Sequence, residues 1–245
     1  MTDAIFYAVS VGAGNAELLT LQAVRVLNEC AVLCFPATDS HEGGTRHIAY
    51  DAVSGAVDVQ KKETLFFPVP MTRDREKVRA AYERIAEQCV ERLRAGKSVA
   101  FCAIGDVSLY STAAKIAEMV RARGFAVEFV AGVNAFSAAS CDAVLSLCDR
   151  DECVTIIPAD AYFSVGKLEA ALRADGTKVL MKMGRHLREI LLLIDACGLR
   201  ERTTLVQNAS LPGDRILHGD ALRAVGDDVV ADAYLSVGIV RGNIK

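Results

Sequence analysis

Short apolar runs typical of β-strands alternate with helical stretches along almost the whole chain of 245 residues. This alternation favours an α/β fold with largely parallel strands, because a helix usually crosses over between two parallel strands. We predict strands at residues 4–11, 31–35, 98–103, 126–130, 153–158, 177–182, 203–208 and 233–240. We predict helices at about 17–29, 44–54, 74–95, 108–122, 134–145, 164–174 and 186–197.

The alternation breaks at residues 147–151, where a polar stretch interrupts it. We therefore predict two compact α/β lobes, residues 1–148 and residues 149–245, with mixed, mostly parallel sheets. Open sheets of this class bind ligands beyond the carboxyl ends of their strands, in a cleft formed by the following turns. We therefore expect a functional site at the strand ends.

The composition excludes several classes of protein. Lysine and arginine number 28 against 31 aspartates and glutamates, a net charge of -3, whereas a nucleic-acid-binding domain is usually basic. No apolar run approaches the length of about 20 residues that a membrane span needs. The N-terminus lacks the basic start of a signal peptide. We therefore expect a cytoplasmic protein without nucleic-acid or membrane partners.

The eight cysteines and four histidines are scattered, with no Cys-x-x-Cys pair and no spacing typical of metal ligands. Most of the cysteines lie inside apolar stretches. We predict that they are reduced core residues, in preference to a disulfide framework or a zinc site. No metal is expected.

Five predicted strand ends carry small or polar residues. The first, Gly12-Ala-Gly14, has the form of a dinucleotide-binding turn, but Glu17 occupies the third glycine position and would repel a pyrophosphate. The alternative is a tight strand-to-helix turn without a ligand. At the second end, Ala103 to Ser111, Asp106 or Ser108 is either a ligand contact or a helix N-cap.

The other three ends lie at residues 130–137, 179–185 and 207–209. Asn134 is either an N-cap or a ligand contact, and Met183 is either a core residue or a ligand contact. Together the five ends suggest one cleft assembled from loops.

The glycine-rich opening at 11–14, with the Leu-Leu-Thr that follows it, resembles the start of the tetrapyrrole methylase family. Residues 105–111 resemble the family's Gly-Asp-Pro loop, and residues 130–133 resemble its Val-x-Pro-Gly-Val turn. The stretches 70–77 and 180–185 narrow the resemblance to the C20-methyltransferases that act on precorrin-2 or cobalt-factor II in cobalamin biosynthesis. The resemblance extends from about residue 5 to residue 241.

Three positions depart from the family's pattern. Val107 replaces the proline of the loop, Ala131 replaces the proline of the turn, and Asn134 stands where serine or threonine is usual. Each lost proline removes a fixed φ angle, so we expect these two loops to be less rigid.

The resemblance implies a homodimer that binds S-adenosylmethionine in the cleft between its two lobes and releases S-adenosylhomocysteine. Carried over residue by residue, it implies a cofactor site at Pro36, Ala103, Gly105, Asp106, Leu109, Asn134, Ala135, Met183, Asn208 and Val237. It also implies that the turn at Gly12 and Gly14 faces the tetrapyrrole.

The implied reaction moves a methyl group from a sulfonium to a macrocycle carbon, so it needs alignment more than a catalytic constellation. The macrocycle is anionic, and its carboxylates call for cationic partners. The candidates for these contacts are Arg73, Arg75, Lys182 and Arg185. A proton must leave the methylated carbon, and Glu17 or Asp106 is a candidate to accept it.

Two other hypotheses stay open at this point. A family member could act on another ring carbon, on diphthamide or on ribosomal RNA, although the net charge of -3 and the absence of tryptophan disfavour RNA. Alternatively, the turn at Gly12 could belong to a binding module or a nicotinamide-dependent oxidoreductase, which Glu17 disfavours.

Overall fold

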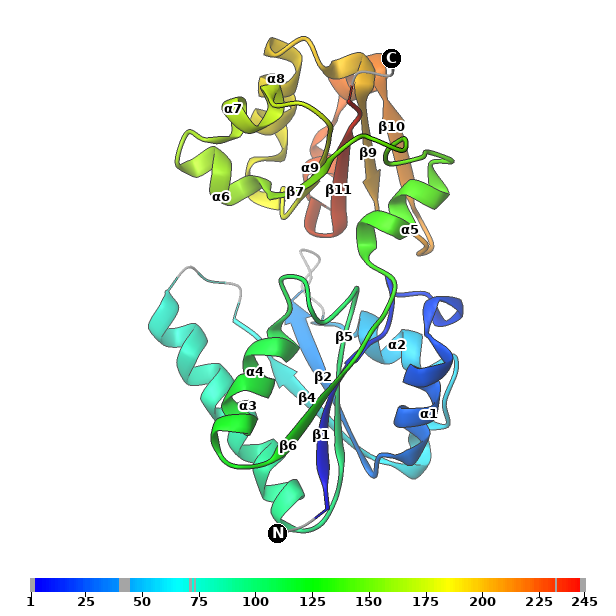
Figure 1. The fold of residues 1–245 in the computed structure, drawn as a ribbon, viewed down its shortest axis with the longest axis vertical. Coiled ribbons are helices and arrows are strands. Elements are labelled where there is room, and N and C mark those ends of the chain that lie inside the picture. Colours follow the sequence, from blue (N-terminus) through cyan, green and yellow to red (C-terminus); the bar gives the residue numbers. More distant parts are fainter. Residues whose placement is uncertain (1–2, 40–44, 71, 73, 232, 243–245) are drawn as a thin grey trace. The chain divides into compact units, whose positions relative to one another are not determined.

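The computed structural model describes residues 3–39, 45–70, 72, 74–231 and 233–242 of the chain. Contacts within the chain divide it into two compact units, Met1–Asn134 and Ala135–Lys245 (Figure 1). The division falls before helix α5 (Ala135–Asp142), whereas the sequence analysis placed it after residue 148. Helix α5 belongs to unit 2 because it packs beside strand β11 (Ser236–Val240) of that unit.

Unit 1 contains a six-stranded sheet in which β4 pairs with β2 and the other strands follow the order β3-β2-β5-β1-β6. The strands are β1 (Ile5–Ser10), β2 (Val32–Asp39), β3 (Thr45–Arg46), β4 (Glu63–Pro68), β5 (Val99–Ala103) and β6 (Ala126–Val130). The short β3 runs antiparallel to β2, and the other pairings between these strands are parallel. This confirms the predicted α/β class and, for this unit, the mostly parallel sheet.

Helices cover both faces of the unit 1 sheet. They are α1 (Leu21–Glu29), α2 (Ile48–Ser54), α3 (Arg75–Arg94) and α4 (Thr112–Ala122). Buried residues of α1 and α2 pack with Cys102 of β5, whereas those of α3 and α4 pack with its neighbour Phe101. Because successive residues of a strand point to opposite faces, β5 contributes to both cores and is fully buried.

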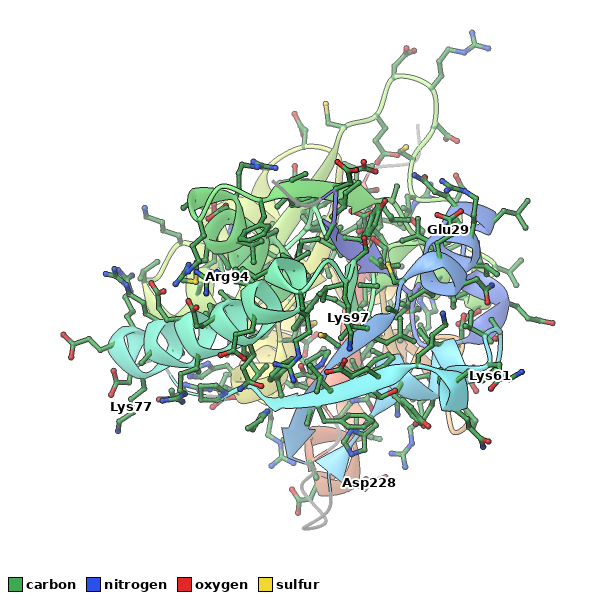
Figure 2. All side chains as sticks on the ribbon, turned by 90° about the horizontal axis from the view of Figure 1, so that it is seen from below. Glu29, Lys61, Lys77, Arg94, Lys97 and Asp228 are labelled. Atoms are coloured by element: carbon green, nitrogen blue, oxygen red, sulfur yellow. The ribbon has the colours of Figure 1, made fainter. Side chains whose placement is uncertain are left out.

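Helix α3 has well-defined ends; Figure 2 labels Lys77 in its first turn and Arg94, its last residue. Asp74 caps its start by accepting the backbone N–H groups of Glu76 and Lys77, each at 3.1 Å. Gly96, at φ +77°, follows its end in the left-handed conformation that glycine adopts without strain. The sequence therefore predicted this helix to within a residue at either end.

Unit 2 contains a five-stranded sheet of order β10-β9-β11-β8-β7. Besides β11, its strands are β7 (Val154–Pro158), β8 (Thr177–Met181), β9 (Thr203–Gln207) and β10 (Arg215–His218). The β7–β8 pair is parallel and the other pairs are antiparallel, so the predicted mostly parallel arrangement is wrong for this unit. The physical reason is visible at β9 and β10, since residues 208–214 form a hairpin connection too short for a crossover helix.

The unit 2 helices beside α5 are α6 (Ala159–Ser164), α7 (Leu168–Arg173), α8 (Leu187–Ala196) and α9 (Asp227–Ala231). Leu172 of α7 and Ile190 of α8 pack with Leu180 and Leu205 of the sheet in one core. Among the described residues, no helix combines the length and the apolar character needed to cross a membrane.

The sequence analysis missed several short or exposed elements. These are β3, β4, β10, α9 and the 3-10 helices η1 (Ala16–Leu18), η2 (Val59–Lys61), η3 (Gly184–His186), η4 (Arg200–Arg202), η5 (Gly219–Ala224) and η6 (Ala233–Leu235). Glu63 of strand β4 pairs with Arg92 of helix α3 at 3.0 Å and with Lys97, which follows that helix, at 2.8 Å. Tertiary contacts thus fix a strand that has few buried side chains of its own.

Candidate functional site

In unit 1, the turns that follow β1, β5 and β6 lie at the same edge of the sheet. Ser10 is level with Ala103, and Val9 is level with Val130, so these three parallel strands end side by side. The register therefore brings the predicted residues Ala103, Gly105 and Asp106 next to the turn at 131–134. Pro36 lies at the same edge, two residues beyond the pair Cys34 and Phe101.

Asp106 joins two of these turns through its carboxylate. Its Oδ2 accepts the backbone N–H of Gly132 at 2.8 Å, and its Oδ1 accepts the backbone N–H of Ser108 at 2.8 Å together with the Ser108 hydroxyl. Partial burial raises the pKa of Asp106, but the three hydrogen bonds outweigh it and hold the pKa below its ordinary value. Both oxygens are thus engaged within the chain, and the carboxylate stays ionised.

Ser10 and Gly132 complete the junction between the turns. Ser10 is fully buried, and its Oγ accepts the backbone N–H of Val107 at 3.0 Å. A Cβ atom on Gly132 would lie only 2.3 Å from the Cβ of Ser10, so the turn needs glycine there. Because a proline at position 107 has no N–H to donate, the departure at Val107 exchanges a fixed φ angle for a buried hydrogen bond.

The glycine-rich turn after β1 is bonded to the loop after β5. The N–H of Gly105 donates to the carbonyl oxygen of Gly12 at 2.6 Å, and the N–H of Val11 donates to that of Ala103 at 3.0 Å. Gly12 has φ +67°, and a Cβ there would lie 2.6 Å from the Cβ of Leu18. The positive φ and the close approach of Leu18 thus require glycine at position 12.

Glu17 lies on the exposed side of this turn. It sits in η1, where its backbone N–H is capped by the Asn15 side chain at 3.0 Å. Thr20 caps α1, and its hydroxyl donates to the carbonyl oxygen of Ala131 at 3.3 Å. The turn at Ala131, which has lost a proline, is thus anchored by Thr20 and Asp106.

In unit 2, Asp160 closes the turn that follows β8. Its backbone N–H donates to the carbonyl oxygen of Lys182 at 3.1 Å. Its Oδ1 accepts the backbone N–H of His186 at 3.2 Å and lies 2.9 Å from the Nδ1 of the same histidine. Asp160 thereby holds both ends of the segment 182–186, which contains the predicted site residues Lys182, Met183 and Arg185.

The side chains of this turn have different surroundings. Met183 is buried in the core, and its sulfur would lie 3.0 Å from a Cβ on Gly238. The Met183 side chain is therefore a core residue, and the backbone is the part of Met183 that a ligand can contact. Lys182 and Arg185 are exposed.

A second aspartate closes the turn that follows β9. Asp142, the last residue of α5, accepts the backbone N–H of Ser210 at 2.6 Å and the Ser210 hydroxyl at 3.2 Å. It thus ties the helix that begins at Ala135 to the turn that contains Asn208. Val237 is buried in β11, opposite Val206 of β9.

Left-handed backbone marks the same turns. Five described residues other than glycine have a positive φ: Tyr110, Val144, Lys182, Asn208 and Ser210. This conformation costs on the order of 1–3 kcal/mol for such residues and is found most often at functional sites. Apart from Val144, all lie in the turns after β5, β8 and β9, a signal that the sequence alone does not carry.

Sequence reasoning missed Ser10, Asp142, Asp160 and His186 as parts of these turns. Asp160 and His186 are 26 positions apart, and their contact depends on the parallel pairing of β7 with β8. Among the predicted cations, Arg75 lies exposed in the first turn of α3, and Arg73 lies outside the described residues. Within the described parts of the chain, no three His, Cys, Asp or Glu side chains gather in a way that could hold a metal ion.

The eight cysteines are all free thiols. Cys30, Cys34, Cys89 and Cys102 are buried in unit 1, as predicted, whereas Cys141 and Cys153 of unit 2 are exposed and Cys148 and Cys197 are half-buried. Burial raises the pKa of Cys30 to about 12 and also raises the pKa values of Cys34 and Cys102. The unit 1 thiols are therefore packing groups and not nucleophiles.

The strand-end turns can hold a ligand through their backbone. Ala103, Gly105 and Gly132 are small, so a ligand can approach the main chain closely there. The carboxylates of Asp106, Asp142 and Asp160 accept N–H groups of the chain, so their part is to hold the turns in place.

Comparison with known proteins gives a consistent result. The family model Tetrapyrrole (Corrin/Porphyrin) Methylases matches residues 6–223. The probable cobalt-precorrin-2 C(20)-methyltransferase of Methanocaldococcus jannaschii is 30% identical, over 96% of this chain and 95% of the relative. The cobalt-precorrin-2 C(20)-methyltransferase of Salmonella typhimurium is 28% identical, over 91% of this chain and 90% of the relative.

A solved structure shares the fold. The uroporphyrin-III C-methyltransferase of Thermus thermophilus, crystallised with S-adenosylhomocysteine, has a TM-score of 0.63 and 20% sequence identity. The match covers 96% of this chain and 96% of that one. With the family model matching most of the chain, these comparisons identify the protein as a member of the tetrapyrrole (corrin/porphyrin) methylase family.

Proposed function

We propose that this protein transfers the methyl group of S-adenosylmethionine to carbon C20 of precorrin-2 or cobalt-factor II, a step of cobalamin biosynthesis. The observation that carries the proposal is the 30% identity to the Methanocaldococcus relative over nearly the full length of both chains. The family match supports a methyl transfer to a tetrapyrrole, and the S-adenosylhomocysteine of the Thermus structure supports the donor.

The reaction is a displacement at the methyl carbon. The donor supplies a sulfonium leaving group, and the electron-rich macrocycle supplies the nucleophilic carbon. The chain has to hold these atoms in line and keep water away, and orientation of this kind contributes on the order of 7–11 kcal/mol in well-arranged cases. Turns anchored by Ser10, Asp106 and Asp160 suit that task, because anchored backbone keeps bound ligands in one geometry.

The donor contacts that we propose are those that the resemblance to the family implies. In unit 1 they are the backbone of Ala103 to Asp106, together with Pro36, Leu109 and Asn134. In unit 2 they are Ala135, Met183, Asn208 and Val237. Both oxygens of the Asp106 carboxylate already accept hydrogen bonds from Ser108 and Gly132. We therefore expect the carboxylate to shape the site and the neighbouring backbone to contact the donor.

The two candidates for the proton acceptor differ in surroundings. Three hydrogen bonds lower the pKa of Asp106 against the effect of its burial, so that its carboxylate is a poor base. Glu17 is exposed, and its cap involves only its backbone N–H. We therefore retain Glu17 as the acceptor. The macrocycle would lie against the turn at Gly12 and Gly14, with Arg75, Lys182 and Arg185 as contacts for its carboxylates.

The same resemblance to the family suggests a homodimer in the cytoplasm. Sedimentation equilibrium over a range of concentrations tests the dimer. A mass that stays at the monomer value of 26.3 kDa would contradict it.

The main test is a paired assay with labelled S-adenosylmethionine. Metal-free and cobalt-loaded forms of the dihydro-tetrapyrrole are offered separately, and we expect one methyl group to be transferred to at least one of them. NMR assignment of the methylated carbon separates C20 from any other ring position, which is the alternative function. No transfer to either form would contradict the proposal.

A second, cheaper test compares two ligands by thermal shift. S-adenosylhomocysteine should stabilise the protein and NAD should not. Stabilisation by NAD and not by S-adenosylhomocysteine would instead support a nicotinamide-dependent oxidoreductase.

A further inference from the structure

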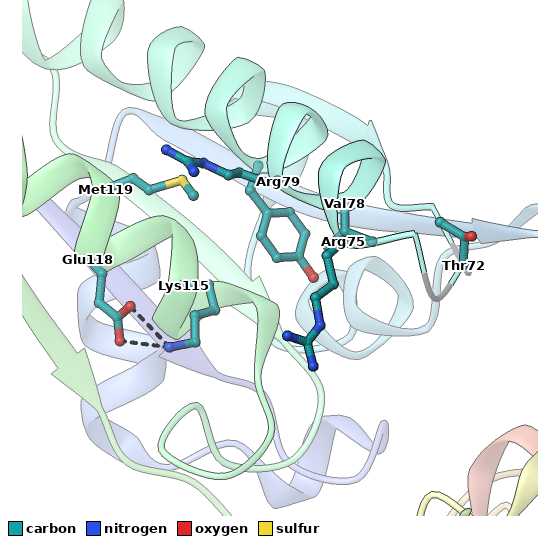
Figure 3. A pocket seen from close by; sticks show the side chains of 8 residues that line it. Thr72, Arg75, Val78, Arg79, Lys115, Glu118 and Met119 are labelled. Carbon is teal, nitrogen blue, oxygen red and sulfur yellow. Dashed lines mark hydrogen bonds and ion pairs between the residues drawn. The ribbon is translucent and has the colours of Figure 1, made fainter. Parts of the chain in front are cut away.

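A hollow of about 340 Å³ opens between α3 and α4 of unit 1 (Figure 3). Its lining is made up of Thr72, Arg75, Val78, Arg79, Tyr82, Lys115, Glu118 and Met119. All eight residues belong to unit 1, so the hollow is complete within that unit. Of the lining residues, the proposed function described so far gives a role to Arg75 alone.

The rim of the hollow is positively charged. Arg75, Arg79 and Lys115 face one carboxylate, that of Glu118. Lys115 pairs with Glu118 at 3.0 Å, and Arg79 lies 3.9 Å from Glu83. These are exposed ion pairs of the kind that contribute little, so an incoming anion can compete for the cations.

Arg75 is the cation with the most freedom to bind a ligand. Among the residues that the structure describes, it has no hydrogen-bond or ion-pair partner, and its side chain is exposed. Figure 3 shows the Arg75 side chain extending away from α3 with its guanidinium at the outer end. A guanidinium presents paired N–H donors that match the two oxygens of a carboxylate.

The floor of the hollow is apolar. Val78, Tyr82 and Met119 are each half-buried there, and the Tyr82 hydroxyl lies 3.3 Å from the Thr112 hydroxyl at the start of α4. A short hydrocarbon arm that ends in a carboxylate fits such a hollow, with its methylenes on the floor and its charge at the rim. Acetate and propionate side chains at the edge of a tetrapyrrole have this form.

The position of the hollow supports this occupant. Helix α4 begins at Thr112, directly after the loop that runs from Gly105 to Ser111, and Arg75 lies in the first turn of α3. Both helix starts lie at the edge of the sheet where the parallel strands end, which is the edge of the proposed site. Since the whole chain is acidic, at -3, an anionic substrate needs a local cluster of this kind.

We propose that the hollow between α3 and α4 binds a carboxylate arm at the rim of the tetrapyrrole, through Arg75, Lys115 and Arg79. This subsite rests on the proposed function, which supplies the tetrapyrrole. It gives Lys115, Arg79 and Tyr82 a binding role. These residues add to the contacts proposed above for Arg75, Lys182 and Arg185.

The test measures binding of uroporphyrin III, a fluorescent polycarboxylic tetrapyrrole, to the full-length protein and its variants. Arg75→Gln and Lys115→Gln should each weaken binding about three- to tenfold, and the double variant should weaken it further. The salt dependence of binding should fall with each charge removed. In the methyl-transfer assay, the KM for the tetrapyrrole should rise while the KM for S-adenosylmethionine stays unchanged.

Arg84→Gln is the matched control. Arg84 is an exposed cation of the same helix. It lies nine residues after Arg75 and therefore points to the opposite side of α3. The control variant should bind uroporphyrin III like the wild type. If the hollow variants also bind like the wild type, the subsite is overturned while the proposed function stands. If the wild type binds no tetrapyrrole and transfers no methyl group, both fail.

Discussion

The two units align their strand-end turns by different means. In unit 1, parallel pairing puts the ends of β1, β5 and β6 at one edge, and backbone hydrogen bonds such as Gly105 to Gly12 join the turns directly. In unit 2 most pairs are antiparallel, and the turns after β8 and β9 are held by Asp160, which follows the parallel neighbour β7, and by Asp142 of α5. Parallel pairing thus aligns three turns in unit 1 but, among the described strands, a single pair of turns in unit 2.

We expect the largest loss of stability from a substitution that disturbs the close packing between the unit 1 turns. We expect Gly132→Ala to destabilise the protein by about 3 kcal/mol, because the new Cβ would lie 2.3 Å from that of buried Ser10. Chemical denaturation monitored by circular dichroism measures the change. Gly124→Ala is the control, since nothing lies within 4 Å of its Cβ and only its positive φ adds a cost of about 1–2 kcal/mol. Equal losses in both variants would contradict tight packing at the junction.

The Asp106 carboxylate joins the turns after β5 and β6. Asp106→Ala leaves the N–H of Gly132 without its acceptor, and we expect affinity for S-adenosylhomocysteine to fall about thirtyfold, as measured by calorimetry. Asp106→Asn keeps an acceptor oxygen and should lose less. Equal affinity in all three proteins would refute the role of the carboxylate.

The same residue gives a pH prediction. The pKa of Asp106 is lowered in the folded protein, so its stabilising contribution is present above the unfolded value of about 3.8 and is lost as pH falls through the folded value. The stability difference between wild type and Asp106→Asn should stay constant from about pH 5 to 8 and shrink at more acidic pH. A difference that changes near neutral pH would point to another group.

In unit 2 we expect smaller and more local effects. Asp160→Ala should free the segment 182–186 and weaken S-adenosylhomocysteine binding about three- to tenfold, with the stability of unit 1 unchanged. His186→Asn places an amide N–H near the position of Nδ1 and should restore much of what His186→Ala loses. Failure of asparagine to restore binding would show that the ring itself matters, through its contact with Phe163.

Substitution of Val144 should have the smallest effect. It tests whether a left-handed residue outside the candidate turns matters for activity. Val144 is a β-branched residue at φ +52°, 90% exposed and outside the candidate turns. Val144→Gly should stabilise the protein by about 1 kcal/mol without changing methyl transfer. Lost activity would show that left-handed residues matter beyond the turns after β5, β8 and β9.

Much of the fold follows from local sequence, and the failures have a common cause. β5 is buried at every position, so its apolar run is plain in the sequence, whereas β4 and β10 lie at sheet edges with mostly exposed or half-buried side chains. An exposed edge strand carries no continuous apolar signal. The antiparallel character of unit 2 also escaped prediction, because strand direction depends on connection length and pairing and not on the strands themselves.

For the candidate site, the sequence indicated which turns matter but not what holds them. Gly105 and Asp106 could be placed at a strand end from the chain alone. The contact of Asp106 with Gly132 depends on the register of β5, β1 and β6, and the contact of Asp160 with His186 depends on the pairing of β7 with β8. Such long-range pairs carry no local pattern.

The distribution of cysteines gives the molecule a built-in reporter for each unit. Every thiol of unit 1 is buried, whereas every thiol of unit 2 is at least partly accessible. An alkylating reagent at neutral pH should therefore label unit 2 at once and reach unit 1 only when that unit opens. Mass spectrometry of the labelled peptides, followed over time, would give the opening rate of each unit from one native sample, without mutation or dye.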